Sequence, residues 1–159
     1  MNQSRRTLLL LPVLLPGALL LARCAPAPKP PPVLTLTMVG SADQNPDPSG
    51  NAAPVAVKVY ELTASAKFES SDWTSLTQNE AATLGADEAA PSQQFVVGPG
   101  ETQTKTFELK SGVQSIGIIV LYRDIDHAQW RALAPAASSG PTKLTLNIAK
   151  AAATLQPSK

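Results

Sequence analysis

A chain of 159 residues, of which 43% are hydrophobic and 16% charged, has room for one domain with a hydrophobic core. Its formal net charge is only +1, and its Lys and Arg residues form no basic stripe, which argues against a nucleic-acid partner. A single cysteine excludes an internal disulfide, and a single histidine leaves little for a metal site.

The first 23 residues are typical of a secretory signal peptide. Arg5 and Arg6 precede an apolar run, residues 7–21, that two prolines interrupt. This run is too short for a membrane span, which needs about 20 apolar residues. We therefore predict that residues 1–23 direct export and are then removed.

Cys24 ends the tetrapeptide LARC, which resembles the lipobox of bacterial lipoproteins, although Arg23 stands where lipoboxes normally have Gly, Ala or Ser. Because a lone cysteine forms no internal disulfide in an oxidising compartment, we predict that Cys24 is the lipid-attachment residue. By resemblance to Gram-negative lipoproteins, Ala25 after the cysteine favours the periplasmic face of the outer membrane. The alternative is an incidental cysteine in a signal that is removed by ordinary cleavage.

Residues 24–32 form a predicted tether that begins with the lipidated cysteine. Five prolines lie among residues 25–32 (APAPKPPP), a composition that favours an extended polyproline II segment of about 25 Å. The alternative is a disordered stub with no spacing role. Removal of residues 1–23 takes three of the thirteen Lys and Arg residues, and the ten left against twelve Asp and Glu give no basic patch for anionic lipid.

Residues 33–155 are predicted to form an antiparallel β-sandwich, followed by a disordered tail at 156–159. One segment, residues 116–122, is apolar throughout, as in a strand that is buried on both faces. Short strands separated by turn signals are typical of a sandwich, and GPGE at 98–101 is interpreted as a hairpin turn. Apolar and polar residues alternate at 33–39, 55–60, 104–109 and 144–148.

One segment, residues 70–85, interrupts the strand pattern. Thr77 and Glu80 have the spacing of a capping box, and Gly85 is a typical helix stop. We expect one or two short helices in this part of the chain. Four apolar side chains are expected to dock them on the sandwich: Phe68, Trp73, Leu76 and Leu84.

A long polar loop, residues 41–54 (SADQNPDPSGNAAP), separates the first two predicted strands. Hairpins commonly use two to five loop residues, so a hairpin does not require this length. Pro46 and Pro48 restrict the backbone, Asp47 favours a turn, and Gly50 permits conformations closed to other residues. These residues are either plain turn formers at a surface or a loop ordered in advance for binding.

No catalytic, metal or cofactor site is recognisable. His127 lies near Asp124 and Asp126, but the predicted domain has no second His and no Cys to complete a metal site, and no G-x-S-x-G motif. VGPGET at 97–102 lacks the lysine and the glycine spacing of a phosphate loop. We expect no enzyme and no cofactor, with His127 exposed in a loop after a strand.

Two roles are open for YRDIDHAQWR, residues 122–131. Trp130 and Arg131 could form an interface hot spot. The structural alternative, which we favour, makes Trp130 an apolar lid on the sandwich edge and Arg123 the partner of a nearby carboxylate.

Several short motifs occur in a fixed order along the chain: the lipobox, NPD at 45–47 with Gly50 and Pro54, VKVYEL at 57–62, Phe68, YRD at 122–124 and WR at 130–131. As a set they resemble the TssJ (SciN) family, the outer-membrane lipoproteins of type VI secretion systems. The resemblance implies a transthyretin-like sandwich with added helices. It also implies a scaffold that binds the periplasmic C-terminal domain of the inner-membrane protein TssM, with TssL as an indirect partner.

In that family the loop between the first two strands engages TssM, and here it is residues 41–53. The resemblance thus gives eight candidate partner-binding residues: Gln44, Asn45, Pro46, Asp47, Pro48, Ser49, Gly50 and Asn51. Two other classes stay open: a periplasmic lipoprotein that binds a small ligand or glycan, and a lipoprotein hydrolase. An aromatic content of 4% argues against the first, and the single histidine argues against the second.

Overall fold

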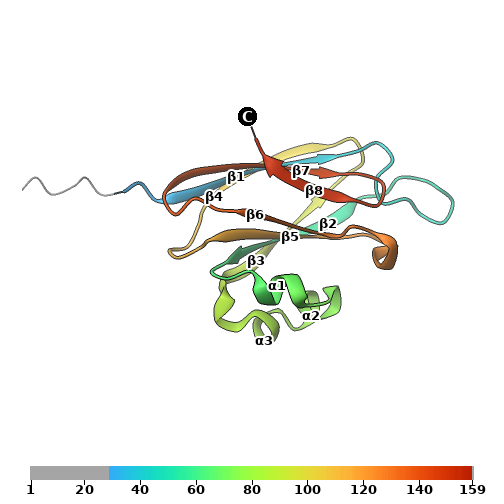
Figure 1. Ribbon diagram of the computed structural model, residues 1–159. Helices are drawn as coiled ribbons and strands as arrows, with labels where there is room; N and C mark the ends of the chain where they lie inside the picture. Colours follow the sequence, from blue (N-terminus) through green and yellow to red (C-terminus); the bar gives the residue numbers. More distant parts are fainter. Residues whose placement is uncertain (1–28, 159) are drawn as a thin grey trace, which may run out of the picture.

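The protein folds as two four-stranded β-sheets, with three short helices on the outer face of one of them (Figure 1). The computed structural model describes residues 29–158, so the predicted signal peptide and Cys24 lie outside the described residues. In spatial order, the first sheet contains β4 (Thr102–Glu108), β1 (Pro32–Gly40), β7 (Gly140–Ile148) and β8 (Ala153–Pro157). The second sheet contains β3 (Glu88–Val97), β2 (Val55–Leu62), β5 (Ser115–Leu121) and β6 (Arg131–Pro135).

The predicted β-sandwich is confirmed, with one exception to its antiparallel arrangement. β1 pairs antiparallel with β4 but parallel with β7, in a register that places Leu36 opposite Leu144. All pairs of the second sheet are antiparallel. A parallel pair needs a crossover connection, and here the chain forms the entire second sheet between β1 and β7.

The main core lies between the two sheets. The inward side chains of β1, Leu34, Leu36 and Met38, are fully buried. They belong to one cluster with Val57 and Ile118 of the second sheet, as the alternating sequence patterns indicate. Ile119 of β5 points to the other face and is also fully buried, because the helices cover it. This explains why the sequence of β5 is apolar on both faces.

The helices are α1 (Ala66–Ser70), α2 (Trp73–Gln78) and α3 (Glu80–Leu84), followed by the 3-10 turn η1 (Gly85–Asp87). They are three rather than the one or two expected, and the predicted capping box is wrong. Asp72 caps α2 by accepting a 2.8 Å hydrogen bond from the Ser75 amide, while the Thr77 hydroxyl donates to the carbonyl oxygen of Trp73 at 2.8 Å. Thr77 therefore lies inside α2, and α3 begins after Asn79, whose side chain forms no capping hydrogen bond.

A second apolar cluster fixes the helices to the outer face of the second sheet. Phe68, Leu76 and Leu84 are fully buried there against Tyr60, as predicted. Trp73, the fourth predicted anchor, is only half-buried and lies outside this cluster. Leu62 and Ile119 complete the buried members of the cluster.

The loop of residues 41–54 connects two different sheets, because β1 belongs to the first sheet and β2 to the second. The same holds for the turn at 98–101, which leads from β3 to β4. The interpretation of GPGE at 98–101 as a hairpin turn is therefore wrong. Alternation shows which face of a strand is buried but not which strand lies beside it.

The ends of the described chain are held by the first sheet. Gln156 and Pro157 pair with Thr145 and Leu144, so the predicted disordered tail is wrong for these residues. At the other end, the carbonyl oxygens of Pro30 and Pro31 accept hydrogen bonds from the Gly140 amide at 3.3 and 3.2 Å. Among the helices of residues 29–158, none has the length and apolar character to cross a membrane.

Candidate partner-binding loop

Gln44 anchors the base of the β1–β2 loop (residues 41–54) to the second sheet. Its side chain is fully buried, and Nε2 donates hydrogen bonds to the carbonyl oxygens of Val97 at 2.8 Å and Ala53 at 3.4 Å. Gly40 makes room for it, because a Cβ at Gly40 would lie 2.3 Å from Oε1 of Gln44. Gln44 thus closes the gap between the end of β1 and the end of β3.

Asn45 ties the loop to two other connections at the same end of the sandwich. Its Oδ1 accepts a 2.8 Å hydrogen bond from the amide of Arg123 in the β5–β6 loop (residues 122–130). The backbone N–H of Asn45 donates at 3.1 Å to the carbonyl oxygen of Lys150 in the β7–β8 turn (residues 149–152). Nδ2 donates to Pro54 O at 2.8 Å, and the backbone has a positive φ of 47°, which Asn tolerates better than most residues.

Burial changes the role of two of the eight candidate residues. Gln44 has no exposed surface and Asn45 is only 4% exposed, so their side chains are not available to a partner in this structure. They hold the loop instead. Their polar character gave no sign of this, because polar residues in a loop are usually exposed. The surface left to a partner is residues 46–51, called the loop tip below.

Asp47 organises the loop tip. Its Oδ1 accepts hydrogen bonds from the amides of Ser49 at 2.8 Å and Asn51 at 2.9 Å, and its Oδ2 accepts from Asn51 Nδ2 at 3.2 Å. The hydrogen bond from the backbone N–H of Asn51, together with those from the other donors, lowers the pKa of Asp47. Gly50, with a φ of 87°, completes the turn by donating to the Asp47 carbonyl at 2.9 Å. The local bonds predicted for Asp47 and Gly50 are therefore present, and the tip has one defined shape.

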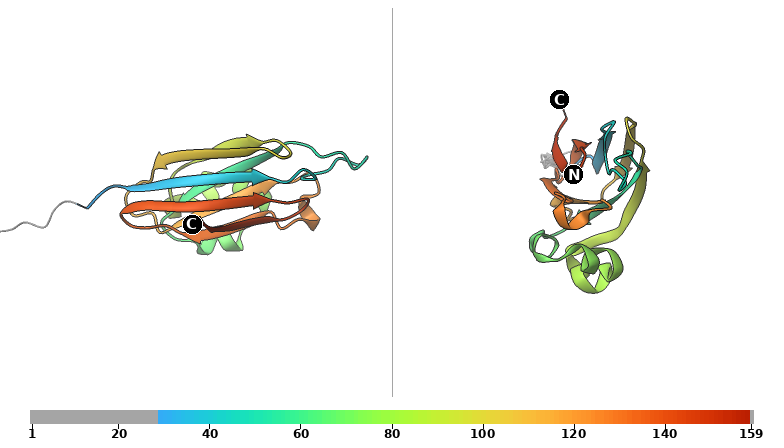
Figure 2. Two further views of the ribbon diagram at one scale, coloured as in Figure 1. Left: turned by 90° about the horizontal axis from the view of Figure 1, so that it is seen from above. Right: turned by 90° about the vertical axis from the view of Figure 1, so that its right-hand side faces the viewer.

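The loop tip extends beyond the sheets at the end of the sandwich opposite to residue 29 (Figure 2, left). Pro48, Ser49, Gly50 and Asn51 are exposed, while Pro46 and Asp47 are half-buried. An anchor on the N-terminal side would therefore leave the tip facing away from it.

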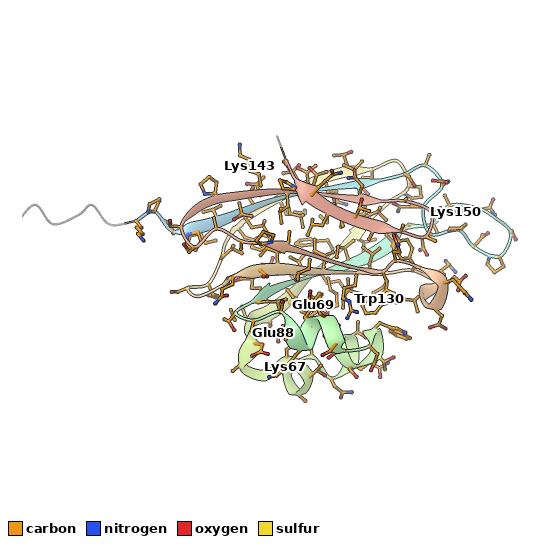
Figure 3. The ribbon with its side chains drawn as sticks, viewed as in Figure 1. Lys67, Glu69, Glu88, Trp130, Lys143 and Lys150 are labelled. Carbon is orange, nitrogen blue, oxygen red and sulfur yellow. The ribbon has the colours of Figure 1, made fainter. Side chains whose placement is uncertain are left out.

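Two hollows lie beside the loop tip and share Pro46 and Asp124. The wider, about 430 Å³, is also lined by Asp47, Pro48 and Arg123. The narrower, about 120 Å³, is lined further by Asn45, Tyr122, Lys150 and Ala151. Lys150 lies at this end of the molecule, as Figure 3 shows. Lys150 could not be identified from the sequence, because nothing in the β7 pattern indicates that the turn after it meets residue 45.

Trp130 and Arg131 have the structural role that we favoured. Trp130 is half-buried and packs against both apolar clusters. The guanidinium of Arg131 lies 4.8 Å from the Trp130 ring centre, and Nη1 donates to the carbonyl oxygens of Phe68 at 2.7 Å and Ser71 at 2.8 Å. The pair therefore fixes α1 to the edge of the second sheet.

Arg123 and His127 differ in how far the predictions for them hold. No carboxylate forms an ion pair with Arg123 within residues 29–158, contrary to the expectation. His127 is exposed, as expected, and its Nδ1 lies 2.7 Å from Oδ1 of Asp124. The hydrogen bond to Asp124 raises the pKa of His127. In the described part of the chain, no group of three His, Cys, Asp or Glu side chains could hold a metal ion.

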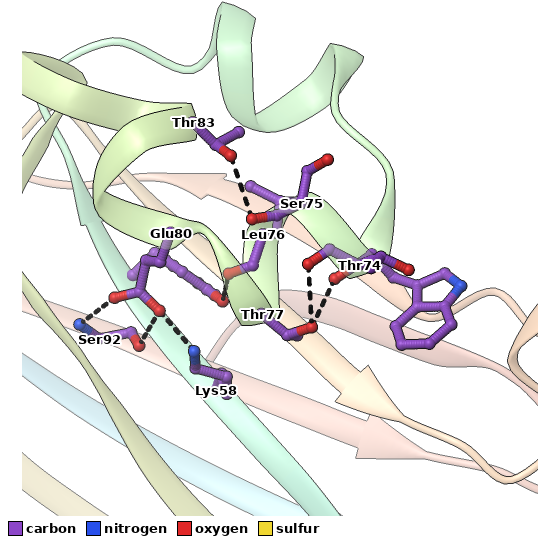
Figure 4. Close-up of polar contacts among 10 residues, drawn as sticks. Lys58, Thr74, Ser75, Leu76, Thr77, Glu80, Thr83 and Ser92 are labelled. Atoms are coloured by element: carbon purple, nitrogen blue, oxygen red, sulfur yellow. Dashed lines mark hydrogen bonds and ion pairs between the residues drawn. The ribbon is translucent and has the colours of Figure 1, made fainter.

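A polar network lies between the second sheet and α3, away from the loop (Figure 4). Glu80 pairs with Lys58 of β2 and accepts from Ser92 of β3, at 2.9 Å from the amide and 2.7 Å from the hydroxyl. Although burial opposes ionisation, hydrogen bonds from Glu88, Lys58 and Ser92 lower the pKa of Glu80 to about 2. Burial, and then the Glu80 carboxylate, raise the pKa of Glu88 to about 7. Oε1 of Glu88 is buried without a partner in the described residues.

Comparison with known families gives one clear match. The sequence profile of T6SS-SciN, described as type VI secretion lipoprotein (VasD, EvfM, TssJ), matches residues 32–151. This range includes both sheets up to the β7–β8 turn, and the loop tip with both hollows. No curated protein shows significant similarity to the chain.

Several solved structures with the same fold are described as parts of type VI secretion systems. The lipoprotein TssJ1 from Pseudomonas aeruginosa is 27% identical, with a TM-score of 0.77, over 82% of this chain and 98% of that one. Lip from Serratia marcescens, described as a membrane-bound component of the system, is 23% identical, with a TM-score of 0.71. The match covers 81% of this chain and 97% of Lip. A chain in a structure described as the TssM C-terminal domain from EAEC is 20% identical, with a TM-score of 0.68 over 80% and 99%.

Proposed function

The chain belongs to the TssJ (SciN) family of type VI secretion lipoproteins, which are structural proteins without enzymatic activity, and on this premise we propose that its loop tip binds the periplasmic C-terminal domain of TssM. Bound there, the chain links the type VI membrane complex to the outer membrane, and TssL is reached only through TssM. The observation that carries the proposal is the preformed, exposed loop tip at the end of the sandwich opposite to residue 29.

The order of the loop tip supports a binding role. Three hydrogen bonds to the carboxylate of Asp47 fix residues 47–51 before any partner arrives. A preordered loop loses less conformational entropy on binding than a flexible one. Pro46 and Pro48 restrict the backbone further. A plain connection between two sheets needs none of this order in its exposed part.

The proposed anchor is the lipid on Cys24. The tether predicted at 24–32 then ends before Pro30, because Pro30 and Pro31 bond to Gly140 and β1 begins at Pro32. The chain enters the sandwich at the end opposite to the loop tip. The tip then points away from the outer membrane, toward the periplasm, where a domain carried by an inner-membrane protein can reach it.

The test is calorimetric titration of the mature lipoprotein, in detergent, with the TssM periplasmic C-terminal domain. A variant with a Gly-Ser sequence of equal length in place of residues 46–51 removes the tip side chains and its hydrogen bonds but keeps Gln44 and Asn45. We expect binding at least about tenfold weaker, or about 1.4 kcal/mol. The control is Ser138→Arg, an exposed change in the connection between β6 and β7. A folded tip variant that binds as tightly as the wild type would disprove the proposal.

A further inference from the structure

The two hollows beside the loop tip form one groove between three connections of the sandwich. Its walls are the loop tip, the β5–β6 loop and the β7–β8 turn, with Pro46 and Asp124 common to both hollows. Asn45 holds these walls together by its hydrogen bonds to Arg123 and Lys150. The groove is therefore part of the fold, and it continues directly from the surface assigned to TssM.

The charged groups of the groove differ in whether they already have partners. Asp47 accepts three N–H hydrogen bonds inside the loop tip, and Asp124 is paired with His127. Within residues 29–158, by contrast, the guanidinium of Arg123 and the ammonium of Lys150 take part in no hydrogen bond or ion pair, although the charge of Arg123 helps to lower the pKa of Asp47. The side-chain N–H donors of these two cations are thus free for a ligand. Asp126 is exposed nearby on the 3-10 turn η2 (Ile125–His127) but lines neither hollow.

We propose that this groove takes an acidic, extended segment of the TssM periplasmic domain, with one carboxylate paired to Arg123 in the wider hollow and another paired to Lys150 in the narrower one. A guanidinium binds a carboxylate with two parallel hydrogen bonds, and a lysine binds it as a point charge. The prolines and the Tyr122 ring give the segment an apolar floor. This inference rests on the proposed function and extends it from the loop tip to two further connections.

The chain offers a matched control for a charge-reversal test. Lys143 and Lys150 are both exposed and both belong to the β7 region, but Lys143 pairs with Thr35 near the start of that strand, far from the groove (Figure 3). Lys143→Glu and Lys150→Glu make the same change in net charge. A general electrostatic effect would therefore weaken binding equally in both variants, whereas a specific contact would affect only the second.

The experiment is titration of the mature lipoprotein in detergent with the TssM periplasmic C-terminal domain at several salt concentrations. We expect Arg123→Glu and Lys150→Glu each to raise the Kd at least tenfold at low salt and to reduce its salt dependence, because each removes one ion pair. Arg123→Lys should keep most of the affinity. Lys143→Glu should bind like the wild type.

The outcomes separate this inference from the proposed function. If the loop-tip variant loses binding while Arg123→Glu and Lys150→Glu bind like the wild type, the tip is the whole contact and the acidic segment is excluded. If all charge reversals, including Lys143→Glu, weaken binding equally, the effect is nonspecific and the inference fails. If neither the tip nor the groove variants affect binding, both proposals fail.

Discussion

The ring of Phe68 lies directly on Gly117, so that a Cβ on Gly117 would be 2.7 Å from Cζ of the ring. Gly117 is in the middle of β5, and the ring is fully buried with its centre 5.3 Å from that of Tyr60, so it cannot move aside easily. We expect Gly117→Ala to lower the free energy of unfolding by about 1–3 kcal/mol through overpacking. Urea unfolding measures this.

The sign of this effect is informative, because alanine would otherwise stabilise a strand relative to glycine. Phe68→Leu in the same chain makes room for the new methyl group. The double variant should therefore be more stable than the sum of the two single effects predicts. Strict additivity would show that Phe68 and Gly117 are not coupled.

The carboxyl pair Glu80 and Glu88 should give the protein a characteristic pH dependence. The pKa of Glu88 is raised to about 7 in the folded chain from 4.5. Between these values the folded chain binds a proton that the unfolded chain lacks, so stability falls as pH rises from about 4.5 to 7. The pKa of Glu80 is lowered to about 2, so its contribution is lost as pH falls below 4.5. Thermal unfolding between pH 3 and 8 tests both windows.

The matched variant is Glu88→Gln, which has nearly the same shape and no titration. The stability of this variant should no longer fall as pH rises from 4.5 to 7. Its stability should still fall as pH drops below 4.5, as in the wild type. The pKa of His127 is also raised, but His127 is present in both proteins, so the difference between them isolates Glu88. Parallel pH profiles for the two proteins would contradict the assignment.

Shortening the β1–β2 loop should have very different effects at its base and at its tip. Replacement of residues 44–51 by Asn-Gly removes Gln44 and Asn45, and leaves the buried carbonyl oxygen of Val97 and the partly buried amide of Arg123 without these hydrogen bonds. We expect a loss of about 2–6 kcal/mol in the free energy of unfolding, since each of the two unsatisfied groups costs about 1–3 kcal/mol. Replacement of residues 46–51 alone by Gly-Ser-Gly should cost much less. Equal urea midpoints for the two deletions would show that the base has no structural role.

Lipid attachment at Cys24 predicts a change of location without a change of fold. If the proposed outer-membrane anchor is correct, Cys24→Ser should release the protein into the periplasm, because acyl chains contribute about 0.8 kcal/mol for each buried methylene and the ten Lys and Arg residues after Arg23 are outnumbered by twelve Asp and Glu. Membrane fractionation measures the location, and circular dichroism measures the fold. A serine variant that still sediments with outer membranes would contradict lipid anchoring.

The local sequence was sufficient for the buried faces of the strands and for the family. Alternating residues in 33–39 and 55–60 determined which side chains form the core, and the unbroken apolar run at 116–122 determined that β5 is covered on both faces. The ordered set of motifs determined the family, and with it the kind of sandwich. The buried faces can be predicted because a strand buries every second side chain, and this leaves an alternation of apolar and polar residues in the sequence.

Tertiary structure alone decided which parts of the loop are framework and which are surface. Gln44 and Asn45 look like the residues beside them, yet their hydrogen-bond partners, Val97 and Arg123, are 53 and 78 residues away. Lys150 is placed beside the groove in the same way, because its carbonyl oxygen accepts a hydrogen bond from the backbone N–H of Asn45. A polar side chain carries no periodic signal of its burial, because the partners that satisfy it are set by which strands become neighbours in space.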